Sequence, residues 1–153
     1  MKVFPEMTVL ENVQLGLLFG RPDSFSSARA AREATTLLEF VGLSAVKATP
    51  AKDLTLVAQK RLEVARALAT KPDLLLLDEL MAGLNPTEVT QAMELVTTIR
   101  EQGVTVLMVE HVMKAIMSVC DRIMVLHHGE KIAEGTPQEI ATSRAVVDVY
   151  LGE

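Results

Sequence analysis

Four consecutive leucines, Leu74 to Leu77, run directly into two carboxylates, Asp78 and Glu79. A short, continuous apolar run of this kind is typical of a strand that is buried on both faces of a parallel sheet. In open parallel sheets, ligands bind beyond the carboxyl ends of the strands. The two acids are therefore expected at the functional edge of a sheet.

Two adjacent carboxylates at such an edge can take different roles, because alternation along a strand points their side chains in different directions. One can hold a magnesium ion, usually through water, while the other orients or deprotonates an attacking water. The alternative is that Asp78 and Glu79 only begin a solvated turn. The pair alone does not decide between these interpretations.

The chain beyond Pro72 alternates short apolar runs with amphipathic helices, which predicts α/β organisation. A helix with Asn85 as N-cap and Pro86 at its first position should join the first two strands. The expected later elements are a strand at 104–109, a strand at 122–126, a turn at 127–129, a return strand at 131–133 and one or two helices within 137–151.

The chain before Pro72 carries helical signals instead. Thr8 and Glu11 have capping-box spacing at the start of one helix. Apolar periodicity predicts a second helix from Ser26 or Ser27 to Val41 and a third at Ala58–Ala69.

A histidine follows the second expected strand, because Glu110-His111 comes directly after Val109. If the two strands run parallel, His111 reaches the same edge as Asp78 and Glu79. Its imidazole could donate a hydrogen bond to a phosphate oxygen, whereas a lone histidine at a helix start is more often a cap or a surface group.

Charge and composition exclude some classes of function. The formal net charge of -5 and the pI near 5.3 argue against a nucleic-acid binder. One cysteine, Cys120, can form neither an intrachain disulfide nor a metal cage, which fits a reducing, cytoplasmic compartment. No apolar run approaches the ~20 residues that cross a bilayer, so membrane contact is expected only through a partner.

Taken together, these motifs resemble the ATP-binding subunits of ABC transporters, in their C-terminal portion, and the resemblance covers nearly the whole chain. The branched-chain amino-acid importers are the most similar subgroup. The segments that carry the resemblance are Met7–Val13, Gln59–Leu68, Leu74–Glu79, Ala82–Pro86, Val109–His111 and Ile132–Pro137.

The resemblance implies a role for each polar residue at the sheet edge. Asp78 matches the Walker B aspartate that binds magnesium, Glu79 the catalytic glutamate, and His111 the switch histidine near the γ-phosphate. ATP and Mg²⁺ are the implied cofactors. The implied fold is an incomplete P-loop NTPase-like parallel sheet at 72–153, with a helical subdomain at 1–71.

Two further segments match loops that act between subunits. Thr55 lies in the segment that matches the signature loop, and Asn85 ends the segment that matches the D-loop. The resemblance implies that both residues take part in binding the nucleotide. In the family, the signature loop contacts ATP bound to the opposing subunit of a head-to-tail dimer, and the helical subdomain docks the membrane subunits. A second ATPase subunit and transporter membrane subunits are the implied partners, which would place the chain at the inner face of the membrane.

The sequence also departs from the family. None of its eight glycines is followed by lysine, so it lacks the Walker A loop that surrounds the phosphates, and Met1 falls after the matching positions of that loop and of the Q-loop. In the signature segment, Val57 replaces a glycine and Ala58 a glutamine, and Leu80 replaces the proline after the catalytic glutamate. Hydrolysis of ATP by this chain alone is not expected.

The missing loop has an architectural consequence as well. In the family, the strand that leads into it lies between those matching 104–109 and 122–126. Its absence should leave two strand edges unpaired, which predicts rearranged pairing, self-association or poor stability. Besides an importer ATPase subunit, the sequence is compatible with a non-enzymatic interaction module that retains the docking and dimer surfaces, or with a gene remnant.

Overall fold

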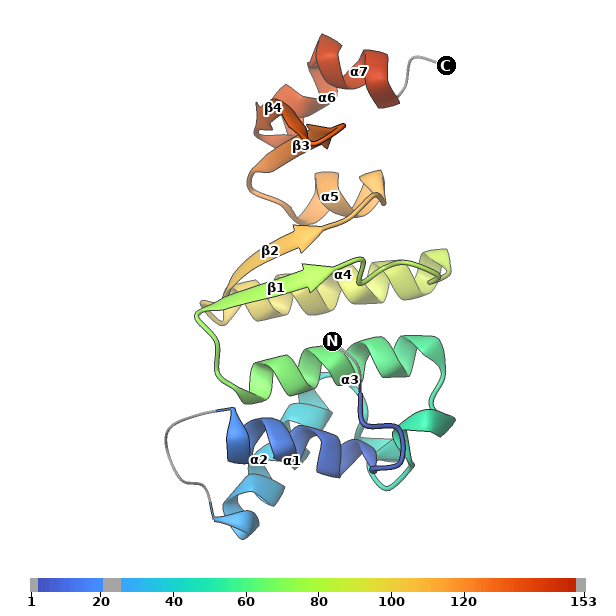
Figure 1. Ribbon diagram of the computed structural model, residues 1–153, viewed down its shortest axis with the longest axis vertical. Coiled ribbons are helices and arrows are strands. Elements are labelled where there is room, and N and C mark those ends of the chain that lie inside the picture. Colours follow the sequence, from blue (N-terminus) through green and yellow to red (C-terminus); the bar gives the residue numbers. More distant parts are fainter. Residues whose placement is uncertain (1–2, 21–25, 151–153) are drawn as a thin grey trace.

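A computed structural model describes residues 3–20 and 26–150, whose elements follow one another along the long axis of the molecule (Figure 1). A helical segment lies at one end and a terminal hairpin with two short helices at the other (Figure 1). The elements of the helical segment are α1 (Val9–Phe19), α2 (Ser27–Phe40), the 3-10 helices η1 (Ser44–Val46) and η2 (Ala51–Asp53), and α3 (Leu56–Ala69). The rest comprises β1 (Leu74–Asp78), α4 (Pro86–Glu101), β2 (Thr105–Val109), α5 (Met113–Val119), β3 (Ile123–His127), β4 (Glu130–Gly135), α6 (Pro137–Thr142) and α7 (Arg144–Tyr150).

The start of α1 is fixed by the predicted capping box. The Thr8 hydroxyl accepts a hydrogen bond from the Glu11 N–H at 3.2 Å, and the Glu11 carboxylate accepts one from the Thr8 N–H at 2.8 Å. One turn further, Asn12 is fully buried, which the sequence did not indicate. Its side chain accepts a hydrogen bond from the Phe4 N–H and donates to the Phe4 carbonyl, so it closes the N-terminal turn over α1.

The second and third helices were predicted with different accuracy. α2 begins after the N-cap Ser26 and ends before Gly42, whose positive φ stops the helix, so this prediction is confirmed. α3 begins at Leu56 instead of Ala58. The predicted start was wrong because Thr55 caps the helix through its side chain, which draws residues 56–58 into the first turn.

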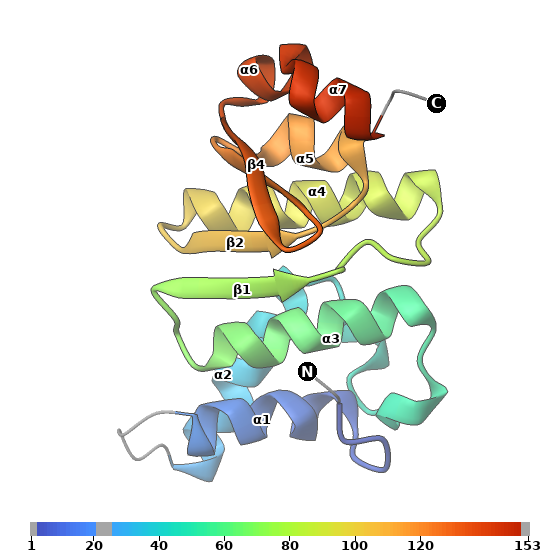
Figure 2. The ribbon, with the colours of Figure 1, turned by 45° about the horizontal axis from the view of Figure 1, so that its top comes forward.

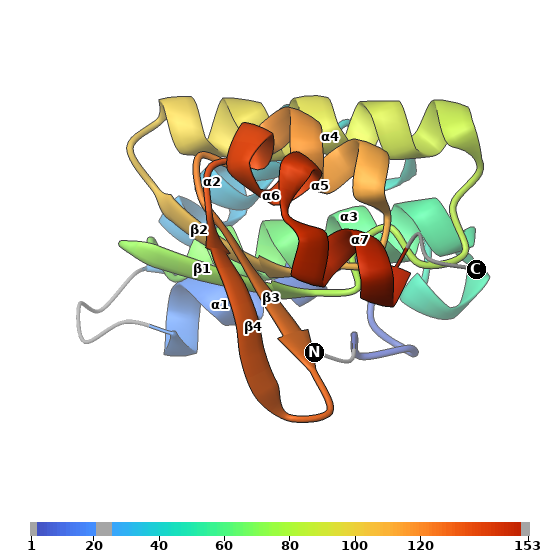
Figure 3. The same cartoon turned by 90° about the horizontal axis from the view of Figure 1, so that it is seen from above.

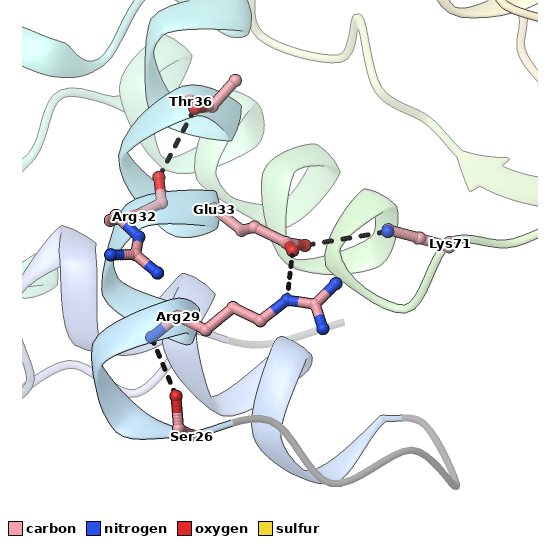
Figure 4. A network of polar contacts seen from close by, with 6 residues as sticks. All are labelled: Ser26, Arg29, Arg32, Glu33, Thr36 and Lys71. Atoms are coloured by element: carbon pink, nitrogen blue, oxygen red, sulfur yellow. Dashed lines mark hydrogen bonds and ion pairs between the residues drawn. The ribbon is translucent and has the colours of Figure 1, made fainter.

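Ion pairs on the surface connect α2 with the chain that enters β1 (Figure 4). Glu33 accepts a hydrogen bond from the Arg29 Nε at 3.0 Å and lies 3.7 Å from the Lys71 Nζ. The Arg29 N–H also donates to the Ser26 hydroxyl that caps α2. Exposed pairs of this kind contribute little to stability, so the joint depends mainly on buried side chains.

The expected parallel strands form a sheet, with β1 beside β2 (Figure 2). In this pairing Asp78 lies opposite Val109. The prediction that these strands are buried on both faces is wrong. Leu75 and Leu77 are buried, but Leu76 and Leu107 on the other face are 65% and 56% exposed. The reason is that α4 covers only one face (Figure 3), and no described element covers the other.

The strands β3 and β4 form a separate antiparallel hairpin, as the sequence predicted. Its loop is His128-Gly129, and both residues have positive φ, of 47° and 82°, which is the backbone of the tight turns that match strand twist. Among the described residues, β2 pairs only with β1 and β3 only with β4. The two strand edges that were expected to lack a partner are therefore unpaired.

One cluster of buried side chains joins the helical segment to the sheet. It runs from Val9 in α1 through Leu62 in α3 and Leu75 in β1 to Val119 in α5. A smaller cluster beneath the hairpin consists of Ile123, Ile140 and Val146. Within the described ranges, no helix is long and apolar enough to span a membrane.

The capping box of α1 predicts a pH-dependent stability. The hydrogen bond from the Thr8 N–H, and to a smaller extent the one from the Thr8 hydroxyl, lower the pKa of Glu11 below its ordinary value of 4.5. The carboxylate therefore stabilises the fold above pH 4.5, and this contribution is lost as the pH falls through the lower pKa of the folded state. Urea unfolding should show Glu11→Gln less stable than the wild type at pH 7, with the difference shrinking towards pH 3.

The control is Glu94→Gln, which changes an exposed glutamate on α4. Its effect on the unfolding free energy should stay the same over this pH range. A Glu11→Gln effect that is equally constant would contradict the assignment of the capping box.

Candidate functional site

Parallel pairing brings the ends of β1 and β2 together at one edge of the sheet. Because Asp78 lies opposite Val109, the residues that follow, Glu79 and Glu110-His111, leave the strands side by side. The Nδ1 of His111 lies 4.0 Å from the Oε1 of Glu79, and both side chains are more than half exposed. The structure thus unites Asp78, Glu79 and His111 at one edge, while their chemical roles remain predictions.

The backbone of Glu79 has an unusual conformation. Its φ is +47°, in the left-handed region that costs a non-glycine residue about 1–2 kcal/mol. Its N–H donates to the Val109 carbonyl at 2.9 Å, and its own carbonyl accepts a hydrogen bond from the Lys60 Nζ at 2.7 Å. Both polar groups of this residue's backbone are therefore engaged where β1 turns away from the sheet.

The residues after Glu79 anchor the turn. Leu80 and Met81 are buried, so the leucine that replaces the family's proline contributes apolar contact here. The Met81 N–H donates to the Oε1 of Glu110 at 2.8 Å. The other oxygen of Glu110 is buried and makes no hydrogen bond with any described residue. Glu110 therefore joins the end of β2 to the loop that follows β1.

Thr55 and Asn85, predicted to contact nucleotide, both act as helix caps. The Thr55 hydroxyl accepts a hydrogen bond from the Ala58 N–H at 3.4 Å. Asn85 accepts hydrogen bonds from the first turn of α4, and the Glu88 carboxylate accepts one from the Asn85 N–H at 2.9 Å. Among the described residues, neither side chain makes a hydrogen bond or ion pair with Glu79 or His111. Their contact with nucleotide stays a prediction.

Asp78 is the residue that the resemblance assigns to magnesium. In the described part of the chain, no three His, Cys, Asp or Glu side chains group closely enough to hold a metal ion. Mg²⁺ usually keeps several waters and takes one or two carboxylates together with phosphate oxygens. The exposed carboxylate of Asp78, at the end of β1, fits this kind of site.

The sequence did not assign a role to Lys60 or Glu110. Lys60 contacts a residue 19 positions away and Glu110 one 29 positions away, so no local pattern reports either contact. Lys60 lies four residues after Leu56, so the two side chains share one face of α3. A Cβ built on Gly83 would lie 2.9 Å from the Leu56 Cδ2, so this face of α3 also meets the loop after β1.

Cys120 does not add a reactive group. Burial is the main cause that raises the pKa of its thiol above the ordinary value of 9.0, and the negative charge of the nearby Asp121 adds to the effect. Since the thiolate is the nucleophile, the thiol is largely unreactive near neutral pH, in line with the sequence-based interpretation.

Solved structures with the same fold define the class of protein. The structure superposes on the ATP-binding cassette MJ1267 in its ADP conformation with a TM-score of 0.83 and 29% identity, covering 97% of this chain and 64% of that one. A nucleotide-free ATP-binding cassette from an ABC transporter gives a TM-score of 0.81 at 27% identity, covering 100% and 68%. The fold is part of a P-loop NTPase-like domain.

Sequence families agree with the fold. The family described as ABC transporter matches residues 1–82, more than half of the chain, and the family described as branched-chain amino acid ATP-binding cassette transporter matches residues 130–153. The chain therefore belongs to the ABC transporter family.

Curated relatives are similar over nearly the whole chain. The high-affinity branched-chain amino acid transport ATP-binding protein LivG of Escherichia coli is 39% identical, and BraF of Pseudomonas aeruginosa, described in the same words, is 40% identical. Each match covers 99% of this chain and 65% of the relative. The chain thus spans less than two thirds of the length of these relatives.

The left-handed backbone at Glu79 predicts that glycine stabilises the fold more than alanine at this position, the reverse of the order expected within a strand. Glu79→Gly should be about 1 kcal/mol more stable than Glu79→Ala, because glycine adopts positive φ without a Cβ clash. At the neighbouring strand residue Asp78 the order should reverse, since glycine weakens a strand. Urea unfolding of the four variants measures both differences. A Glu79→Ala variant as stable as Glu79→Gly would contradict the observed backbone conformation.

Proposed function

We propose that this chain supplies the magnesium-binding and water-activating part of an ATP-binding subunit in an ABC importer for branched-chain amino acids. The observation that carries the proposal is the meeting of Glu79 and His111 beside Asp78 at the end of a parallel strand pair. The relatives named for branched-chain amino acid transport support the choice of importer.

In this proposal, each side chain at the sheet edge acts on a bound nucleotide. Glu79 accepts a proton from, or orients, the water that attacks the γ-phosphate. His111 donates a hydrogen bond to a phosphate oxygen. Asp78 would hold Mg²⁺, which would supply positive charge to offset that of the phosphates.

The remaining parts of an active site come from elsewhere. A glycine-rich phosphate loop is needed to hold the triphosphate, and the chain has no glycine followed by lysine. We propose that another segment of the cassette supplies this loop, and that Thr55 and Asn85 contribute at the interface with a second ATPase subunit. Residues 1–71 would act as the helical subdomain that docks membrane subunits on the cytoplasmic side, and 72–153 as the partial ATPase core.

A second candidate function is a non-enzymatic interaction module. The uncovered face of the β1–β2 sheet favours it, because Leu74, Leu76, Leu107 and Val109 are each more than half exposed there. Exposed apolar patches of this kind mark interaction surfaces or aggregation sites. We refer to these four residues as the bare sheet face.

Reconstitution tests the ATPase proposal. The chain is co-expressed with the phosphate-loop segment of a LivG relative, and ATP hydrolysis is compared with that of the chain alone. Hydrolysis should appear only in the combined protein, and Glu79→Gln should lower it at least ~100-fold, the contribution of a general base, while ATP binding persists. Asp78→Asn should instead weaken the binding of ATP with Mg²⁺.

Glu101→Gln, a change at the exposed end of α4, serves as the control and should leave hydrolysis unchanged. Equal hydrolysis by the combined wild type and its Glu79→Gln variant would rule out the proposed role of Glu79. Stable association without any nucleotide binding would favour the interaction module.

The bare sheet face and the unpaired strand edges predict self-association of the chain. Sedimentation velocity should show the average mass rising with concentration, and Leu76→Lys should shift the protein towards monomer because it places a charge on the face. Phe19→Lys is the matched control, since Phe19 is an exposed apolar residue on α1, away from the sheet. A wild type that stays monomeric at all concentrations would exclude this association.

A further inference from the structure

We propose that the start of α3 acts within its own chain as a clamp that positions Glu79, with Lys60 and Glu110 as positioning residues. The clamp comprises Leu56, Lys60 and Glu110, and it holds the loop from Glu79 to Gly83. The benefit to catalysis rests on the proposed function of Glu79, whereas the clamp itself is a property of the folded chain.

One side of the clamp is a single face of α3. Leu56 and Lys60 are four residues apart and therefore neighbours on the helix surface. The Lys60 ammonium donates a hydrogen bond to the Glu79 carbonyl at 2.7 Å. Leu56 packs so close to Gly83 that a Cβ added to this glycine would lie 2.9 Å from the Leu56 Cδ2. The face thus contacts both ends of a five-residue loop.

The other side of the clamp is the end of β2. The Val109 carbonyl accepts the Glu79 N–H at 2.9 Å, and the Glu110 carboxylate accepts the Met81 N–H at 2.8 Å. The Oε2 of Glu110 is buried, so a carboxylate is placed in this joint despite a desolvation cost. The loop is therefore held by polar contacts from two elements that are distant in sequence.

The conformation of Glu79 explains why such contacts are needed. A non-glycine residue in the left-handed region persists only where the surrounding structure determines it. Leu80 and Met81 are buried after it, so the loop also has apolar anchors, but these do not fix the peptide of Glu79 itself. The hydrogen bond from Lys60 fixes that peptide, and with it the direction in which the carboxylate leaves the backbone towards His111.

The clamp also connects the helical segment to the site. Thr55, in the segment that matches the signature loop, caps the start of α3, and α3 packs against α1. A hydrogen bond of 2.7 Å is lost if its partners separate by about 1 Å, so a shift of α3 relative to β1 that the flexible Lys60 stem does not follow would release the Glu79 carbonyl. A partner that displaces the helices would therefore change the position of the carboxylate.

The first test uses NMR of the purified chain without nucleotide. Lys60→Met should shift the carbonyl carbon resonance of Glu79 upfield, because the charge-assisted hydrogen bond is removed, and should alter the backbone coupling constant that reports its φ. Lys60→Arg, which retains a cationic donor, should restore both signals. Lys47→Met is the control, since the Lys47 side chain is exposed and the described residues offer it no hydrogen bond. An unchanged Glu79 carbonyl in Lys60→Met would overturn the proposal.

The second test measures hydrogen exchange of the Met81 amide. Glu110→Ala should speed exchange about tenfold or more, the factor expected when a hydrogen bond to a charged acceptor is lost. Glu110→Gln keeps an oxygen acceptor and should recover most of the protection. Thermal unfolding is recorded in parallel, so that a local change is separated from loss of the fold. Equal exchange in the wild type and Glu110→Ala would refute the role of Glu110.

These readouts do not depend on ATP. If the clamp signals respond as expected but the reconstituted protein does not hydrolyse ATP, the clamp is upheld and the proposed function fails. If hydrolysis depends on Glu79 but the Glu79 carbonyl resonance does not change in Lys60→Met, the proposed function is upheld and the clamp is refuted.

Discussion

The pairing of β1 with β2 is the contact on which the rest of the site depends. These five-residue strands run parallel and in register, so every residue that follows one strand meets the residues that follow the other. Glu79 and His111 are 32 positions apart in the sequence, and this pairing brings the ends of their strands side by side, where the two side chains lie 4.0 Å apart. A shift of the register by one residue would exchange the two faces of a strand and remove the acids from the histidine.

The parts of the fold that could be predicted from the sequence are those fixed by local chemistry. Thr8 with Glu11 forms the expected capping box, Asn85 caps α4 as expected and is joined by Glu88, and the expected turn at 127–129 closes at His128-Gly129. In each case the interacting groups lie within three residues of one another, so their spacing in the sequence is enough to predict the contact.

The parts that were wrong or missed depend on contacts across long separations. The leucines of β1 indicated a strand, but a run of apolar residues does not say how many faces are covered, and Leu74 and Leu76 are exposed. Lys60 and Glu110 lie in segments that carry the family resemblance, but no role was assigned to either, because a lysine on a helix and a glutamate at a strand end are usually solvated. Only the fold places each of them on the loop after β1.

The bare sheet face makes the thermal stability of this protein sensitive to binding by other polypeptides in solution. A surface that binds another polypeptide only in the folded state shifts the unfolding equilibrium by RT ln(1 + [L]/Kd), whatever the identity of the bound polypeptide. The unfolding temperature of the chain should therefore rise with the concentration of any polypeptide that binds over Leu76 and Leu107 in the folded state alone. A value measured on the dilute chain would be the lower limit of that range.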